Sequence, residues 1–178
     1  MRRLKVDLDD LELAFENSFP EQSYYLGLET GEVLLVSSEM REELEDLYKD
    51  LRAGGQELPD DVGDLLEGRD IPEWQHEEFL AAHQIEMASP GRYIGIPRAD
   101  SDEAYRDMER FIDTVKDRWL SERLQSAIRG RGAFRNFKDV LSEHQREEER
   151  WFAFRDERTR QRVLEWLEAE GIEPIVGE

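Results

Sequence analysis

The segment at residues 130–141, which begins with two glycines on either side of one arginine, constrains the fold more than any other part of this chain. It reads G-R-G-A-F-R-N-F-K-D-V-L. At about 100° per residue its apolar side chains fall within one arc, which predicts an amphipathic helix over residues 132–142. Gly130 suits the left-handed conformation that ends a preceding helix, so we expect a sharp turn between two helices. Both Phe134 and Phe137 are expected in the core.

Basic residues follow one edge of the same segment. Arg131, Arg135 and Lys138 have i, i+4, i+7 spacing and line up beside the apolar face of the predicted helix. We call these three residues the basic ridge, and Arg129 and Arg155 are candidate extensions of it. Two interpretations stay open. The cations contact a phosphate or an acidic partner, or they are solvated or paired with the protein's own carboxylates.

Two further arginines raise the same question. Arg155, Arg158 and Arg162 have i, i+3, i+7 spacing, which would continue the basic ridge along a later helix. Acidic residues are interleaved with them, so pairing within the helix is an equally good interpretation.

The chain is strongly acidic, and its charge is unevenly distributed. Its formal net charge is −20 over 178 residues. Residues 1–100 carry 25 acids and 9 bases, residues 101–178 carry 19 acids and 15 bases, and residues 118–138 hold six bases against one acid. The acidic excess argues against indiscriminate binding to polyanions, because long-range repulsion opposes their approach. A local basic patch still acts at close range, since the Debye length is about 8–10 Å in moderate salt.

The composition indicates one folded domain. Hydrophobic residues make up 38% of the chain, with four Trp and eight Phe, which is enough apolar surface for a core. We expect a single domain over residues 1–178, with an acidic α/β part at 1–99 and a helical part at 100–178. The absence of cysteine excludes disulfides and thiolate chemistry and suits a reducing compartment. No apolar run approaches the roughly 20 residues that span a bilayer, and no secretory signal is recognised. A soluble, cytoplasmic protein without membrane contact is therefore expected.

The first half contains a hairpin signal. Two β-prone runs, residues 24–28 and 32–36, flank Glu29-Thr30-Gly31, which predicts a hairpin over residues 24–36. The second run is apolar on both faces, so it is expected inside the sheet with cover on each side. A third strand is predicted at residues 92–96, ending at Pro97.

Three helices are predicted around these strands. The first spans residues 7–17 with Asp9 or Asp10 as its cap, the second follows a cap at Ser37 or Ser38, and the third opens at Pro72 and spans residues 73–87. His76 and His83 lie two turns apart on the third helix, about 10.5 Å along its axis, too far to share one metal ion. We interpret both histidines as boundary residues. Residues 54–71 are predicted to be a loop with one helical turn near 62–66.

The second half is predicted to be helical. One helix begins at Asp100, with Glu103 at capping-box spacing, and continues to Gly130 with a kink near Trp119. A last helix is capped by Asp156 and closed by Gly171, and the apolar tail at residues 172–176 adds an edge to the sheet or packs on a helix. The fold class is thus α+β: a small antiparallel sheet, made of the hairpin and the third strand, packed on a predominantly helical second half.

Catalytic signals are sparse. Ser142 and His144 are the only close Ser/His pair, and two residues apart on a helix they do not face each other. Neither a phosphate-binding loop nor a dinucleotide fingerprint occurs. The acidic loop with Asp60, Asp61, Asp64 and Glu67 could bind Ca²⁺ or Mg²⁺ but lacks the EF-hand pattern. We predict no metal and no cofactor, and the oligomeric state is open.

Four blocks of the sequence carry a resemblance to a known family. They are Y-Y-L-G-L-E-T-G-E-V at 24–33, D-S-D-E-A-Y-R-D-M-E-R-F-I at 100–112, G-R-G-A-F-R-N-F-K-D-V-L at 130–141, and W-F-A-F-R-D-E-R with the later E-W-L-E-A-E-G-I-E-P. Together they resemble Uncharacterised Protein Family 0158, a set of bacterial proteins. The resemblance implies no established activity, cofactor or catalytic residue.

Three hypotheses for function follow. The first is a non-enzymatic binding or regulatory module whose basic ridge, extended by Arg129 and Arg155, contacts an acidic protein or a nucleic acid. In the second, the basic segment is purely structural and its cations pair within the protein. The third is an enzyme that uses carboxylates in a cleft between the sheet and the helices.

Overall fold

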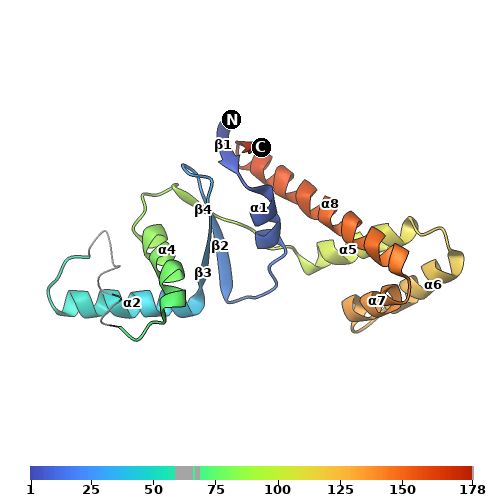
Figure 1. Cartoon of the computed structure of the whole chain (residues 1–178), viewed down its shortest axis with the longest axis horizontal. Helices are drawn as coiled ribbons and strands as arrows, with labels where there is room; N and C mark the ends of the chain where they lie inside the picture. The colour runs from blue at the N-terminus through green and yellow to red at the C-terminus, as the bar shows by residue number, and fades with distance from the viewer. Residues whose placement is uncertain (59–65, 67–68, 178) are drawn as a thin grey trace.

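The computed structural model describes residues 1–58, 66 and 69–177 and has an α+β fold, as predicted. The molecule is elongated, with α2 and α4 at one end, the strands in the middle and α5 to α7 at the other end (Figure 1). In chain order the elements are β1 (Arg2–Val6), α1 (Leu8–Phe15), β2 (Gln22–Gly27), β3 (Val33–Ser37), α2 (Ser38–Ala53), a 3-10 helix (Glu73–Gln75), α4 (His76–Glu86), β4 (Tyr93–Gly95), α5 (Ser101–Asp113), α6 (Arg118–Ala127), α7 (Ala133–Ser142), α8 (Gln145–Ala169) and β5 (Ile172–Val176).

The predicted hairpin and third strand form one antiparallel sheet. Its strand order is β3-β2-β4, with Tyr24 opposite Leu35 in the hairpin. β3 is therefore an edge strand, and the prediction that it lies inside the sheet is wrong, because β4 pairs with β2 instead. The expected cover on both faces of β3 is present, since Val33 packs on one hydrophobic cluster and Val36 belongs to another.

The two ends of the chain form a second, parallel pair of strands. β1 pairs with β5 in a register that places Arg2 opposite Ile172 and Val6 opposite Val176. One of our two alternatives, that the C-terminal tail adds an edge to the antiparallel sheet, is therefore wrong. The N-terminal strand was not predicted, because only Leu4 and Val6 of its five residues are buried and the rest are polar or charged.

The helices of the first half begin where side chains can cap them. Asp7 caps α1 by accepting hydrogen bonds from the backbone N–H groups of Asp9 and Asp10, so the prediction of Asp9 or Asp10 as the cap is wrong. The helix starts earlier because β1 ends directly before Asp7. Ser37 caps α2, in agreement with the sequence. Pro72 precedes a 3-10 turn rather than α4 itself.

The second half contains two departures from the predicted helices. The helix expected from Asp100 to Gly130 is two separate helices, because α5 ends at Asp113 and Asp117 caps a new helix, α6. Conversely, α8 is one continuous helix of 25 residues. Asp156 lies in its interior and is not a cap. Glu147 and Glu148 in the first turn of α8 favour this earlier start, since they complement the helix dipole.

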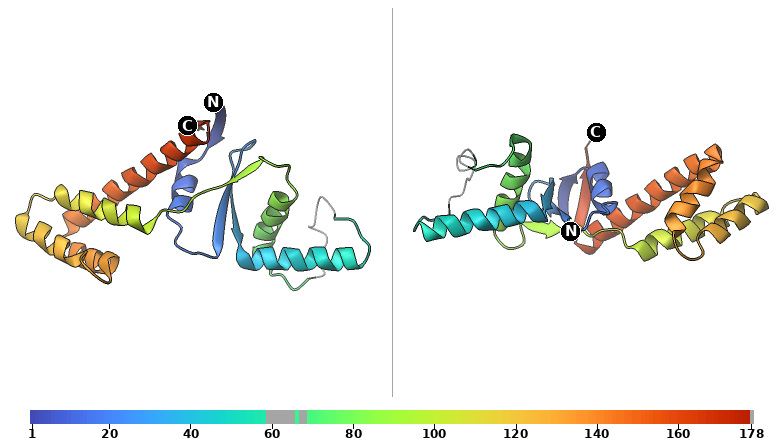
Figure 2. Two further views of the ribbon diagram at one scale, coloured as in Figure 1. Left: turned by 180° about the vertical axis from the view of Figure 1, so that it is seen from behind. Right: turned by 90° about the horizontal axis from the view of Figure 1, so that it is seen from below.

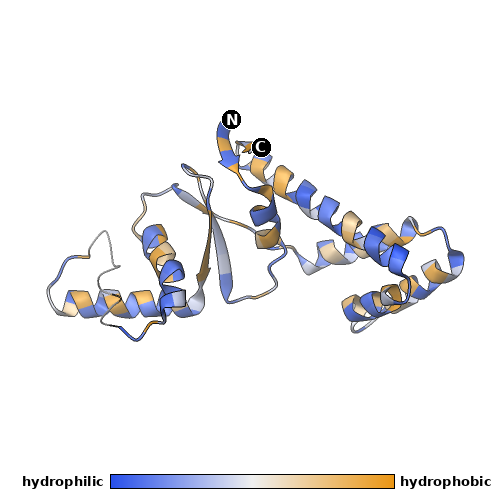
Figure 3. Ribbon diagram, in the orientation of Figure 1, coloured by the Kyte–Doolittle hydropathy of each residue, from blue (hydrophilic) through white to orange (hydrophobic). Residues whose placement is uncertain are grey.

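Three clusters of buried residues follow the long axis of the molecule. The first joins β1, β5, α1 and the C-terminal part of α8 to one face of the antiparallel sheet, and the second packs α2 and α4 on the other face. The third is formed by α5, α6, α7 and the start of α8 around Phe111, Phe137 and Trp151. Each helix contributes an apolar stripe between hydrophilic stretches, as the hydropathy colouring shows (Figure 3). None of the helices in the described part of the chain is long and apolar enough to cross a bilayer.

Candidate cation and aromatic surface

α7 forms as the amphipathic helix that the sequence predicts. Gly130 and Gly132 have φ angles of 82° and 73°, a left-handed conformation that makes the tight turn between α6 and α7. Phe137 is only 1% exposed, and its ring lies 4.9 Å from that of Trp151 and 6.2 Å from that of Phe111, measured between centroids. This aromatic contact anchors α7 to α5 and α8.

Phe134 departs from the prediction that both phenylalanines are buried. Its side chain is 42% exposed. Leu141 lies on nearly the same side of α7 two turns later and is buried, so direction around the helix does not by itself decide exposure. Ala133, in the same turn as Phe134, packs against the third cluster, but Phe134 does not belong to it. The sequence alone shows the direction of Phe134 but not which side chains of α7 the cluster covers.

The residues of the basic ridge precede and follow Phe134 in the sequence. Arg131, Arg135 and Lys138 are all exposed, and so is Arg129 just before the turn. Within the part of the chain that the structure describes, none of these four side chains makes a hydrogen bond or an ion pair. Arg118 and Arg123 on α6 differ, because they pair with Glu122 and Glu143 at 3.3 and 3.0 Å.

Arg155, the remaining candidate, has a different environment. Its guanidinium lies 3.9 Å from a carboxylate oxygen of Glu16 at the end of α1 and 3.6 Å from one of Asp156. It also covers the ring of Phe152 at 5.5 Å. The structure therefore places Arg155 among the protein's own carboxylates, whereas the other candidates lie at or beside the α6–α7 turn.

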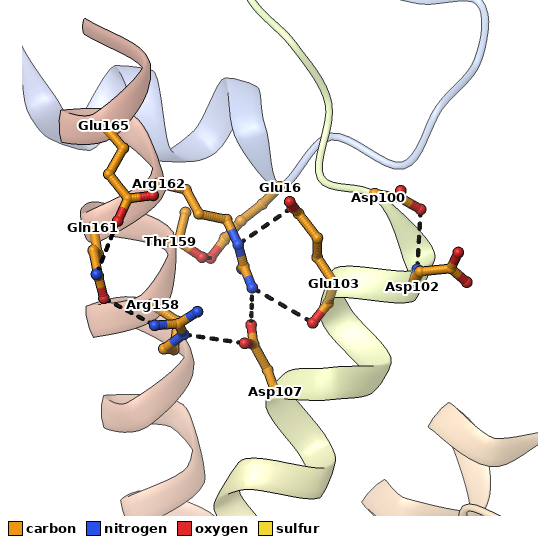
Figure 4. Close-up of polar contacts among 10 residues, drawn as sticks. All are labelled: Glu16, Asp100, Asp102, Glu103, Asp107, Arg158, Thr159, Gln161, Arg162 and Glu165. Carbon is orange, nitrogen blue, oxygen red and sulfur yellow. Dashed lines mark hydrogen bonds and ion pairs between the residues drawn. The ribbon is translucent and has the colours of Figure 1, made fainter. Parts of the chain in front are cut away.

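Arg158 and Arg162 do not continue the basic ridge. Both reach from α8 to Asp107 on α5, at 3.1 and 2.6 Å (Figure 4). Arg162 also pairs with Glu103 at 3.3 Å. Asp107 is only 2% exposed, so this carboxylate is stabilised by the two guanidinium groups that share it. We call Asp107, Arg158 and Arg162 the buried ion cluster.

Sequence analysis missed Asp107, although a signal was present. Asp107 stands four residues before Phe111, which places an acid at the edge of the apolar face of α5. A carboxylate buried there needs a cationic partner, and the i, i+4 pair Arg158 and Arg162, both partly buried, supplies two. Only the packing of α5 on α8 shows that these groups meet.

Trp119 lies in a groove between α6 and α7. The groove has a volume of about 460 Å³ and is also lined by Arg123, Asn136 and Val140. Trp119 is 59% exposed and lies in the first turn of α6, where the sequence predicted a kink and the structure has a break between two helices. Its ring is nevertheless engaged: the guanidinium of Arg123 lies 4.8 Å from its centroid, and His144 contacts it edge-on at 6.1 Å.

A cleft with carboxylates also exists, where β1, α1 and the hairpin turn meet. Its volume is about 620 Å³, and Asp7, Asp9, Asp10 and Glu32 contribute to its lining together with Arg160. Asp7 caps α1 and Asp9 pairs with Arg160 at 2.8 Å, so both have structural partners. No group of three or more potential metal ligands occurs among the described residues.

The polar pairs that sequence analysis singled out have structural partners. His83 is 3% exposed, so the boundary interpretation is wrong for this residue, and its Nδ1 lies 2.6 Å from the Tyr48 hydroxyl. Burial raises the pKa of Tyr48 to about 12. Nε2 of His76 lies 2.9 Å from the carbonyl oxygen of Ile71. Ser142 donates to the carbonyl of Asp139 at 2.6 Å. The acidic loop with Asp60, Asp61, Asp64 and Glu67 lies outside the described residues.

Comparison with known proteins identifies the family. Residues 72–178 match the model of the Uncharacterised protein family (UPF0158). The chain belongs to this family. A UPF0158 protein of Pseudomonas aeruginosa is 28% identical over 175 residues, which cover 98% of this chain and 88% of the relative. UPF0158 proteins of Chlamydia muridarum and Chlamydia trachomatis are each 29% identical over 92 residues, 51% of this chain and 28% of theirs.

The UPF0158 match contains both charged features of the helical end. The basic ridge and the buried ion cluster lie within residues 72–178, whereas α1, the hairpin and α2 precede the matched segment. No solved structure matches the chain. Since the family name describes no activity, function has to be argued from the geometry.

Proposed function

We propose that this protein is a non-enzymatic binding module, whose basic ridge contacts a negatively charged partner. The observation that carries the proposal is the set of exposed cations at the start of α7, which have no internal partner among the described residues. Seven of the thirteen arginines in residues 101–178 form an ion pair with a carboxylate. The ridge cations form none among the described residues, so their charge is available to another molecule.

The shape of the molecule supports this proposal. α7 lies at one end, and the acidic α2 and α4 lie at the other, beyond the strands (Figure 2). α8 runs from the α7 end back to β5 and has 25 residues, which corresponds to about 37 Å at 1.5 Å per residue. This length is several times the Debye length of about 8 Å at physiological salt. Repulsion from the acidic end is therefore screened at the ridge.

The cleft beside β1, α1 and the hairpin turn favours a non-enzymatic module over an enzyme that uses carboxylates for catalysis. A general acid or base has to be free to exchange a proton with a substrate. Two of the four carboxylates in the cleft beside β1 and α1, Asp7 and Asp9, are instead engaged in a helix cap and an ion pair. We also place the module in the cytoplasm, a proposal supported by the cysteine-free composition.

Retention on immobilised heparin tests the proposal. A protein of net charge −20 binds heparin only through a local basic surface. Arg131→Glu with Lys138→Glu is expected to abolish retention at low salt. The matched control is Lys116→Glu with Arg146→Glu, which makes the same change in charge at two exposed cations outside the ridge.

The control variant is expected to elute close to the unmodified protein. Circular dichroism of all three proteins verifies that the helices are intact. If the unmodified protein passes through the column at low salt, or if both variants lose retention equally, the basic ridge is not a binding surface.

A further inference from the structure

We propose that the partner of the basic ridge is a single-stranded nucleic acid and that Phe134 is the platform on which one base stacks. This inference rests on the proposed function. Its starting point is the position of Phe134, which is 42% exposed and stands three residues after Arg131, one before Arg135 and four before Lys138. Arg131 lies in the turn before α7, while Arg135 and Lys138 follow Phe134 on the helix itself, with Lys138 at the neighbouring i+4 position.

The ring of Phe134 differs from the other exposed aromatic rings of the helical end. Arg123 covers Trp119 at 4.8 Å, and Arg155 covers Phe152 at 5.5 Å. Within residues 101–177, all of which the structure describes, no cation and no second ring lies against Phe134 in this way. The exposed part of this side chain, 42%, is therefore accessible to a ligand.

The chemistry of an open ring between cations favours a nucleic acid over an acidic peptide. The face of a phenyl ring carries partial negative charge, so carboxylates gain nothing from lying against it. A nucleobase stacks on the same face, with about 1–3 kcal/mol per base, while its phosphates pair with nearby arginine and lysine. Arg131 and Arg135 add planar guanidinium groups that match phosphate oxygens.

Stacking on Phe134 also favours a single strand over a duplex as the ligand. In a duplex the faces of the bases are covered by their neighbours, so an exposed phenyl ring has no base face to contact. The ridge is short, since Arg135 and Lys138 are about 4.5 Å apart along α7 and Arg131 lies in the turn just before the N-cap Gly132. A flexible strand can place a few phosphates and one base on this length, away from the acidic end of the molecule.

Fluorescence anisotropy with labelled probes tests the inference. The probes are oligouridylate and oligothymidylate of about 12 nucleotides, a DNA duplex of equal length and a polyglutamate peptide. We expect both single strands to bind more tightly than the duplex and the peptide. Phe134→Ala is expected to weaken binding of the single strands about tenfold, because one stacked base is lost. The two single strands show whether the 2′-hydroxyl contributes.

Two further variants isolate stacking from hydrophobic contact and from a general loss of aromatic surface. Phe134→Trp is expected to retain binding, whereas Phe134→Leu is expected to behave like Phe134→Ala. Trp119→Ala removes an exposed aromatic from the same pair of helices and is expected to leave single-strand affinity unchanged, since its ring already contacts Arg123 and His144.

The inference is overturned if Phe134→Ala binds the single strands as well as the unmodified protein does. It is also overturned if the duplex or polyglutamate binds equally tightly. In either case heparin retention that still depends on Arg131 and Lys138 shows that the basic ridge binds anions and that only the stacking partner was misidentified. If the unmodified protein also fails to bind heparin at low salt, the proposed function itself is wrong.

Discussion

Two sets of cations in the helical end have similar spacing in the sequence and opposite roles in the structure. Arg131 in the turn before α7 and Arg135 and Lys138 on α7 are exposed and have no internal partner among the described residues. Arg158 and Arg162, four residues apart on α8, converge on Asp107, which is almost completely buried. Helical spacing places cations on one face in both cases, but only in the second case does another helix bring a carboxylate to that face.

This difference teaches that a run of basic residues has to be assigned by the element that packs against it. The aliphatic stems and guanidinium groups of Arg158 and Arg162 lie in the contact between α5 and α8, where a missing partner would leave a buried charge. The ridge cations lie on the exposed side of α7 and in the turn before it, where no other helix in the described part of the chain packs on them, so they remain solvated. Four predictions follow from this contrast, in order of expected effect.

Removing the carboxylate of Asp107, which Arg158 and Arg162 share, tests the contribution of the buried ion cluster to stability. Asp107→Ala leaves two guanidinium groups together with fewer acceptors, and we expect a loss of about 3 kcal/mol in the free energy of unfolding. For a chain of this size the melting temperature falls by about 6–12 °C. Urea and thermal denaturation measure both. Glu109→Ala, at an exposed acid of the same helix, is the control and is expected to change little.

A double-mutant cycle measures the contact itself. Asp107→Ala and Arg162→Ala, alone and together, are expected to give a coupling energy of about 1–3 kcal/mol. The control pair is Arg135 and Asp139, which have i, i+4 spacing on exposed α7 without a direct ion pair. Its coupling is expected to be at most about 0.5 kcal/mol. Equal coupling in the two pairs would show that the buried ion cluster contributes no more than an exposed pair.

The salt dependence of binding to a single-stranded probe tests the role of the basic ridge. For a single-stranded probe, the logarithm of the affinity falls with the logarithm of the salt concentration by about 0.7 per neutralised phosphate. Arg131→Ala with Lys138→Ala is therefore expected to reduce the slope by about 1.4. Lys116→Ala with Arg146→Ala is the control, and an equal change in its slope would place the binding surface elsewhere.

The smallest effect is expected for the stability of the ridge variants. Because the side chains of Arg131, Arg135 and Lys138 have no partner among the described residues, replacing each by alanine should change the free energy of unfolding by less than about 0.5 kcal/mol. Urea denaturation measures this change. A loss comparable to that of Asp107→Ala would mean that the ridge is structural.

Local patterns predicted much of the fold. The hairpin over residues 24–36, the strand before Pro97, α2 behind Ser37 and the glycine turn before α7 all depend on neighbouring residues, and all are present. Features that depend on distant partners were missed or wrong. β1 is stable only through β5 at the other end of the chain, and the edge position of β3 depends on where β4 pairs.

The candidate site shows the same division. The sequence by itself determined that α7 is an amphipathic helix with cations along one edge, because helical periodicity and glycine conformation are local properties. The tertiary structure alone decided that Phe134 is exposed while Phe137 is buried, and that Arg162 is paired while Arg135 has no partner among the residues that the structure describes. The physical reason is that burial and ion pairing depend on which surface lies opposite a side chain, and that surface comes from residues far away in the sequence.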